Sequence, residues 1–187
     1  MPGPEMAVLG NLILDDVVLP DGTTRMAQPG GAALYVALGA RLWGVEVGVV
    51  SVVGEDYPEG ILAALRDRGL HLDGVRRAPG PSLRTWLLYE GRRRRVVHRL
   101  DGPTHAEMSP GPADLPADWR PRACHLARMP FAAQRAAEAV AAAVRRASPA
   151  DRCPPGVVLR HPLQAVPSLR FRRDAPGTFF ANLVVGR

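Results

Sequence analysis

The sequence contains no lysine, because all 24 basic residues among its 187 positions are arginine. This absence excludes a Schiff-base mechanism and the lysine of a Walker-type phosphate loop. Cysteine is scarce as well: Cys124 and Cys153 are too few for a disulfide framework or a cysteine-rich metal site. Cys124 lies in the apolar run 123–127, so we expect it to be a buried thiol on a core strand.

No apolar run approaches the ~20 residues that span a bilayer. Residues 1–5 also lack the basic start and apolar stretch that are typical of a secretory signal. We therefore expect a cytoplasmic protein without a membrane partner. Apolar residues make up 47% of the chain, which is enough to exclude wholesale disorder and to bury one core.

The formal net charge of +6 accompanies a composition rich in Arg, Ala, Gly and Pro, which indicates a coding bias. One true basic cluster occurs, Arg92-Arg93-Arg94-Arg95, directly after Glu90-Gly91. A nucleic-acid contact is one interpretation of such a cluster. We favour a solvated hairpin tip, because no aromatic platform or recognition helix accompanies the arginines. No nucleic-acid partner is expected.

Strand-like and helix-like segments alternate along the first 130 residues, which predicts a doubly wound α/β sheet. Buried strands are expected at 7–9, 45–53, 70–75 and 123–127. Helices are expected at 30–42, with Leu34, Leu38 and Leu42 forming one apolar face, and at 61–68. Gly54, Asp56 and Gly60 are expected to shape a turn and cap the second helix. A further Ala-rich helix is predicted at 131–147.

Two hairpins interrupt this alternation, at about 16–28 and 83–100. The character of the chain changes after Ala147, because residues 148–187 contain six prolines, no glutamate and no helix caps. We divide the chain into residues 1–147, which form a folded domain, and a poorly patterned tail, 148–187. The tail would suit a truncated or frame-shifted reading of a longer gene.

The candidate site begins at Gly30-Gly31, a glycine pair that opens the Ala-rich helix. Backbone amides at such a helix entrance can approach an oxygen-rich ligand, although a simple tight turn would also explain the pair. Asp15 follows the first strand, at the sheet edge where α/β proteins bind ligands. The alternative for Asp15 is a loop or capping aspartate. Its neighbour Asp16 is expected to be exposed.

These features together resemble the N-terminal half of the ribokinase-like (PfkB-type) carbohydrate kinase family. The resemblance covers roughly residues 8–147. It rests on the order and spacing of Gly10 with Asp15, the pair Gly30-Gly31, and the segment Val53-Gly54-Glu55-Asp56 with Gly60. It implies a mainly parallel sheet with flanking helices and a small β-lid, which the two hairpins would form. The fold would be incomplete at its C-terminal end.

The resemblance also implies a sugar or nucleoside substrate, with Asp15 accepting hydrogen bonds from its hydroxyls and Gly30-Gly31 giving close backbone contact. ATP and Mg²⁺ are the expected cofactors of the full-length family, and a homodimer through the lid is a further expectation. Tyr35 stands where many sugar-specific members carry asparagine. Its phenol can donate one hydrogen bond and stack on a ligand, or it can serve as core packing.

The catalytic segment of the family, Gly-Ala-Gly-Asp at a helix N-terminus, has no match in this sequence. Ala175-Pro176-Gly177-Thr178 lacks the acid after its glycine, and Pro176 lacks an amide donor. The expected function is therefore ATP-dependent phosphoryl transfer to a sugar or nucleoside in the full-length form, with this fragment inactive. A non-catalytic sugar-binding or dimerising module is the alternative. A dinucleotide-binding protein fits less well, because Gly10-Asn11-Leu12 is not a Gly-x-Gly-x-x-Gly turn.

Overall fold

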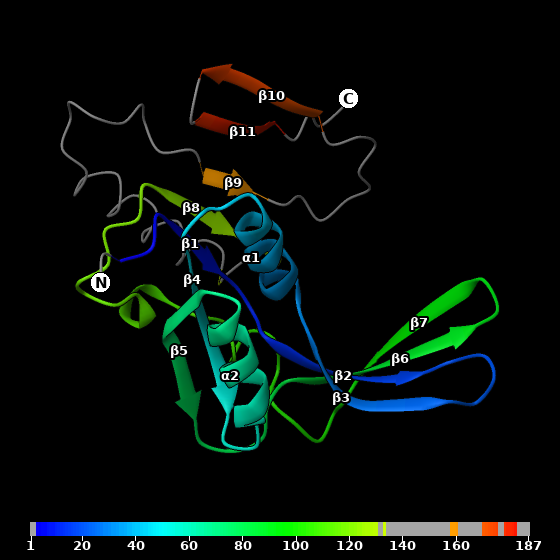
Figure 1. Cartoon of the computed structure of the whole chain (residues 1–187). Coiled ribbons are helices and arrows are strands. Elements are labelled where there is room, and N and C mark those ends of the chain that lie inside the picture. Colours follow the sequence, from blue (N-terminus) through cyan, green and yellow to red (C-terminus); the bar gives the residue numbers. More distant parts are fainter. Residues whose placement is uncertain (1–2, 131–132, 134–157, 161–169, 176–177, 183–187) are drawn as a thin grey trace.

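The body of the molecule is built on a five-stranded parallel sheet (Figure 1). The computed structural model describes residues 3–130, 133, 158–160, 170–175 and 178–182. The strand order in the sheet is β5-β4-β1-β8-β9. In chain order the strands are β1 (Met6–Leu9), β4 (Val47–Gly54), β5 (Leu70–Ala78), β8 (Ala123–Leu126) and β9 (Val158–Arg160).

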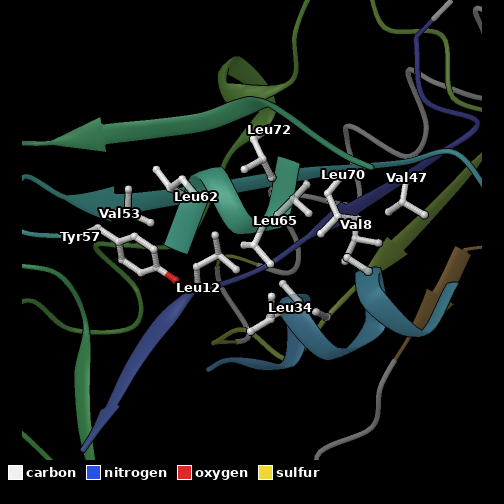
Figure 2. Close-up of a cluster of buried hydrophobic side chains, with 14 of the residues drawn as sticks. Val8, Leu12, Leu34, Val47, Val53, Tyr57, Leu62, Leu65, Leu70 and Leu72 are labelled. Carbon is white, nitrogen blue, oxygen red and sulfur yellow. The ribbon is translucent and has the colours of Figure 1, made fainter. Parts of the chain in front are cut away.

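Strand β4 lies inside this sheet, and every one of its residues is buried. Its β-branched run suits a strand that is covered on both faces. Helices α1 (Ala32–Leu42) and α2 (Glu59–Asp67) contribute to the main apolar cluster on one face (Figure 2). That cluster draws on β1, β2 (Ile13–Val18), β4, β5, both helices and the segments after β1 and β4. It includes Val8, Leu12, Leu34, Val47, Val53, Tyr57, Leu62 and Leu65.

A second apolar cluster contains Leu9, Val50, Trp119, Leu126 and Met129. Trp119 packs directly on β4, because a Cβ on Gly48 would collide with its indole ring. A short 3₁₀ helix, η1 (Pro112–Asp114), lies in the connection before β8. Cys124 is buried on β8, as the sequence predicts.

The lid is a separate four-stranded sheet with the order β3-β2-β6-β7, and Figure 1 shows it reaching away from the body. Hairpin β2–β3 and hairpin β6–β7 are each antiparallel, and a parallel pairing of β2 with β6 joins them. In chain order the strands are β2 (Ile13–Val18), β3 (Thr24–Gly30), β6 (Arg84–Glu90) and β7 (Arg93–His98). The mainly parallel sheet, the flanking helices and the β-lid are therefore confirmed.

The described parts of the C-terminal region form strands. Strand β9 pairs in parallel with β8, and β10 (Arg170–Ala175) pairs in antiparallel fashion with β11 (Thr178–Asn182). Apart from residue 133, the helix predicted at 131–147 lies outside the described residues. The division between a domain at 1–147 and a poorly patterned tail stays a prediction.

One detail of helix α1 differs from the prediction. Ala33, Leu34 and Ala37 are buried, whereas Leu42 is 87% exposed. The expected apolar face at Leu34, Leu38 and Leu42 is therefore wrong at its last position, which is the last residue of α1. Within the described residues, no helix has the length and apolarity that crossing a bilayer requires.

Candidate functional site

Asp15 lies at the base of the lid. Strand β2 already begins at Ile13, so Asp15 belongs to a strand and not to the loop or cap that the sequence left open. It pairs in register with Gln28 of β3 on one side and with Thr85 of β6 on the other. The Thr85 hydroxyl donates a hydrogen bond of 2.6 Å to Asp15 Oδ1.

The glycine pair lies directly against this carboxylate. A Cβ on Gly30 would overlap Asp15 Oδ2, so only glycine leaves room for the carboxylate at this position. Gly31 has a φ of 101°, and a Cβ there would overlap the carbonyl oxygen of Asn11. At both glycines, the space that a side chain would take is therefore occupied by neighbouring groups of the chain, one of which is the Asp15 carboxylate.

Gly31 is also the N-cap residue of α1. No side chain caps this end, and the first turn carries no acidic residue. The unpaired amides and the positive dipole end of a helix stabilise nearby negative charge and oxygen ligands. The structure thus brings together a carboxylate, a close backbone and a helix N-terminus, contributed by Asp15, Gly30 and Gly31.

Tyr35 lies in the first turn of α1 and is 64% exposed. The core-packing interpretation of this residue is therefore wrong. Its phenol is open to solvent or to a ligand near the start of the helix.

The expectation that Asp16 is exposed is also wrong, because its side chain is only 1% exposed. The guanidinium of Arg84 contacts both of its carboxylate oxygens, with 2.9 Å from Nη2 to Oδ1 and 2.9 Å from Nε to Oδ2. The amide of Ala27 donates to Oδ1 at 2.8 Å. Ala27 has a φ of 51° and lies at an irregularity in the β2–β3 ladder. Its amide is not paired within the ladder there, and the Asp16 carboxylate accepts its hydrogen bond instead.

Burial opposes the charge of Asp16, but the hydrogen bonds from Arg84 and Ala27, and the charges of Arg84 and Arg99, outweigh it. The pKa of Asp16 is therefore lowered from its ordinary value, and this carboxylate is ionised at neutral pH. Asp16 is a structural ion-pair partner at the base of the lid, on a β-strand where consecutive side chains face opposite sides.

The end of β4 and the segment after it form hydrogen bonds with Ser82, which lies just before lid strand β6. Asp56 accepts a hydrogen bond of 2.6 Å from the Ser82 amide, and the Gly54 amide donates a hydrogen bond of 3.1 Å to Ser82 Oγ. The prediction that Asp56 caps α2 is wrong, because the N-cap is Pro58, and Gly60 lies inside the helix. A Cβ on Gly54 would collide with the backbone at Ser82, so this glycine permits a close approach of the two segments.

Two buried polar residues near the site were not singled out by their sequence pattern. Asn11 donates from its side-chain amide to the carbonyl of Met108 at 2.7 Å, which ties a distant loop to the end of β1. Tyr57 is 1% exposed, and within the described residues its hydroxyl has no hydrogen-bond partner. Burial, and secondarily the negative charge of Asp15, raises the pKa of Tyr57 to about 12. In Figure 2 its oxygen points toward Leu12.

The arginine cluster lies at the far end of the lid, where Arg92 to Arg95 are all exposed. Arg95 Nη2 forms an ion pair of 3.1 Å with Glu90 across the hairpin.

No protein-family profile matches the chain. A cytidine kinase from Thermococcus kodakarensis is 38% identical over 85 residues, which are 46% of this chain and 30% of that protein.

Solved structures give a likeness of fold. An uncharacterized sugar kinase from Pyrococcus horikoshii superposes with a TM-score of 0.62 and 18% identity, over 82% of this chain and 51% of that one. A putative ribokinase II from E. coli in complex with ATP and Mg²⁺ gives a TM-score of 0.62 and 15% identity, over 83% and 51% of the two chains.

The chain thus spans about a third of the cytidine kinase and about half of each of these solved chains. The resemblance to the N-terminal half of a ribokinase-like (PfkB-type) carbohydrate kinase is confirmed, and the chain has that part of the fold.

Proposed function

We propose that this chain binds a sugar or nucleoside at the base of the lid. One observation carries the proposal: the Asp15 carboxylate lies against Gly30 at the entrance of α1. A carboxylate oxygen accepts hydrogen bonds from ligand hydroxyls, and the amides of a helix N-terminus suit oxygen-rich groups. Tyr35, exposed on the first turn of α1, is available to stack on a ligand or to donate a hydrogen bond to it. The similarity to a cytidine kinase supports a nucleoside as the first ligand to test.

In the full-length form, we propose that the bound hydroxyl receives the γ-phosphoryl group of ATP with the help of Mg²⁺. Phosphoryl transfer depends on positioning and on the stabilisation of charge, and the family supplies both from a Gly-Ala-Gly-Asp segment. The 187 residues contain no such segment. The nearest sequence, around Ala175 and Thr178, has these two residues paired across an antiparallel ladder. We therefore expect this chain to bind the acceptor without phosphorylating it.

Isothermal titration calorimetry with cytidine and with ribose, each in the presence and absence of ATP, tests the binding. We expect saturable binding of at least one of them that does not require ATP, and its loss in Asp15→Asn. Asp73→Asn serves as the matched control, because Asp73 is exposed on β5, away from the lid. Equal binding by both variants would remove Asp15 from the site, and robust ADP release by these 187 residues would contradict the proposed inactivity.

A lid-mediated homodimer is a second proposal, and it rests on apolar exposure. Met26, Val96 and Val97 on the lid strands are each 45–46% exposed, and Leu100 just beyond β7 is 97% exposed. Val96 and Val97 are consecutive on β7 and face opposite sides of the lid, so a second copy of the chain on either side would cover part of this apolar area. Sedimentation velocity should show a dimer that Val97→Glu converts to a monomer. A monomeric wild-type protein at high micromolar concentration would contradict this proposal.

A further inference from the structure

Thr85 of the second lid hairpin forms a hydrogen bond to the candidate ligand-binding carboxylate, Asp15. Its side chain is on β6, in register with Asp15 of β2, and Thr85 as a whole is only 3% exposed. The Thr85 hydroxyl donates a hydrogen bond of 2.6 Å to Asp15 Oδ1. Among the described residues, no other side chain donates a hydrogen bond to the Asp15 carboxylate.

This hydrogen bond fixes the orientation of the Asp15 carboxylate beside Gly30. An aspartate carboxylate rotates broadly about its terminal torsion, so the plane of its two equivalent oxygens is not fixed unless a partner holds one of them. Thr85 is β-branched and stiff at χ1, which makes its hydroxyl a well-defined donor. With Oδ1 held by Thr85, Oδ2 is the oxygen that lies against Gly30 at the entrance of α1.

Neighbouring groups do not duplicate this function. The adjacent Arg84 is engaged by Asp16, through contacts to both carboxylate oxygens. The Tyr57 hydroxyl lies close enough for its pKa to respond to the charge of Asp15, but it donates no hydrogen bond to a described residue.

We propose that Thr85 is a positioning residue for ligand binding. It holds Asp15 Oδ1 so that Oδ2 is presented, at the N-terminus of α1, to a hydroxyl of a polyol or nucleoside. The proposal rests on the proposed function for its ligand, but the orientation of the Asp15 carboxylate is a property of the protein alone. The two can therefore fail separately.

The experiment compares wild type with Thr85→Val, which keeps the shape and removes the donor, and with Thr85→Ser, which keeps the donor. Crystal structures of wild type and Thr85→Val should show the Asp15 carboxylate rotated away from Gly30 in the variant. Calorimetry with cytidine and ribose should show a roughly five- to tenfold weaker affinity for Thr85→Val, as expected for one lost hydrogen bond. Thr85→Ser should bind within about twofold of wild type. Thr85→Ala is the second donor-free variant, in case valine prevents folding.

An unmoved Asp15 carboxylate in Thr85→Val or Thr85→Ala would overturn the proposal, and so would unchanged affinity in a wild-type background that binds. Unfolding of both donor-free variants would overturn it too, because the hydroxyl would then serve the fold. A rotated carboxylate, with no binding of either probe by wild type, would support the positioning function and count against the proposed ligand class.

Discussion

Strands β4 and β7 show how differently the body and the lid are built. Every residue of β4 is buried, whereas every residue of β7 is exposed. The body sheet is stabilised by apolar clusters on its faces. The lid lacks such burial along its edge strand β7.

At that base, consecutive residues of β2 form polar cross-strand pairs with consecutive residues of β6. Asp15 pairs with Thr85, and Asp16 pairs with Arg84. Asp16 combines burial with a full ion pair, whereas Asp15 is only partly buried and keeps one oxygen beside Gly30. The two neighbouring carboxylates thus differ in their surroundings: Asp16 is paired with Arg84, whereas we propose that Asp15 binds a ligand.

The largest effect is expected in the body. Leu9→Ala removes a fully buried side chain from β1 and should lower the free energy of unfolding by about 2–5 kcal/mol, the usual cost of a core truncation. Leu100→Ala, where the side chain is 97% exposed beyond the lid, should change it by less than ~0.5 kcal/mol. Urea unfolding followed by circular dichroism measures both. Similar effects of the two variants would contradict the contrast between body and lid.

Asp16→Asn should have the next largest effect, because it leaves Arg84 without its charged partner. The cost should be roughly 2 kcal/mol, below the ~3–5 kcal/mol of a fully buried pair, because the Arg84 side chain remains 24% exposed. The pKa of Asp16 is lowered on folding, so its contribution is present above about pH 4 and is lost as the pH falls through the folded pKa. The difference between wild type and Asp16→Asn should therefore shrink in acid.

Unfolding curves between pH 2.5 and 7 measure this convergence. Asp73→Asn is again the control, since Asp73 is exposed. A gap between wild type and Asp16→Asn that stays constant across this range would show that the ion pair does not stabilise the lid.

Two glycine substitutions compare the effect of an added Cβ at the candidate site with its effect inside α1. Gly30→Ala places a Cβ on Asp15 Oδ2, so we expect a loss of about 1–3 kcal/mol in stability and a displaced carboxylate. Gly39→Ala lies inside α1, where an added Cβ meets nothing within 4 Å, and alanine should raise stability by up to about 1 kcal/mol. Opposite signs are the expected outcome in thermal unfolding. A stabilising Gly30→Ala would mean that the carboxylate does not lie where the structure has it.

Patterns that are local in the chain could be predicted from the sequence. The β-branched run that forms β4, the Ala-rich helix α1 and both lid hairpins follow from periodicity and turn residues within a dozen positions. These elements also gave the order and spacing that indicate the ribokinase-like fold.

Contacts between distant segments could not be predicted in the same way. Which of Asp15 and Asp16 faces the interior depends on the register of β2 with β6, a strand about 70 residues away. Arg84 is one of 24 arginines, and no local signal distinguishes it as an ion-pair partner. For Tyr35, the sequence left both contact with a ligand and core packing open, and the packing of α1 on the body excludes the second.

Tyr57 gives the smallest expected effect and the sharpest test of the boundary between body and lid. Its ring packs in the main apolar cluster, yet its hydroxyl has no hydrogen-bond partner among the described residues. Tyr57→Phe should therefore raise stability by about 1 kcal/mol at pH 7, because the variant removes a buried polar group that is not satisfied. Folding raises the pKa of Tyr57 from 10.0 to about 12, so wild type should lose stability as the pH rises above 10, and the variant should lose less. Urea midpoints at pH 7 and pH 11 measure both effects. A destabilising Tyr57→Phe would mean that the hydroxyl has a partner, and Asp15, whose charge already acts on this phenol, would be the first group to examine.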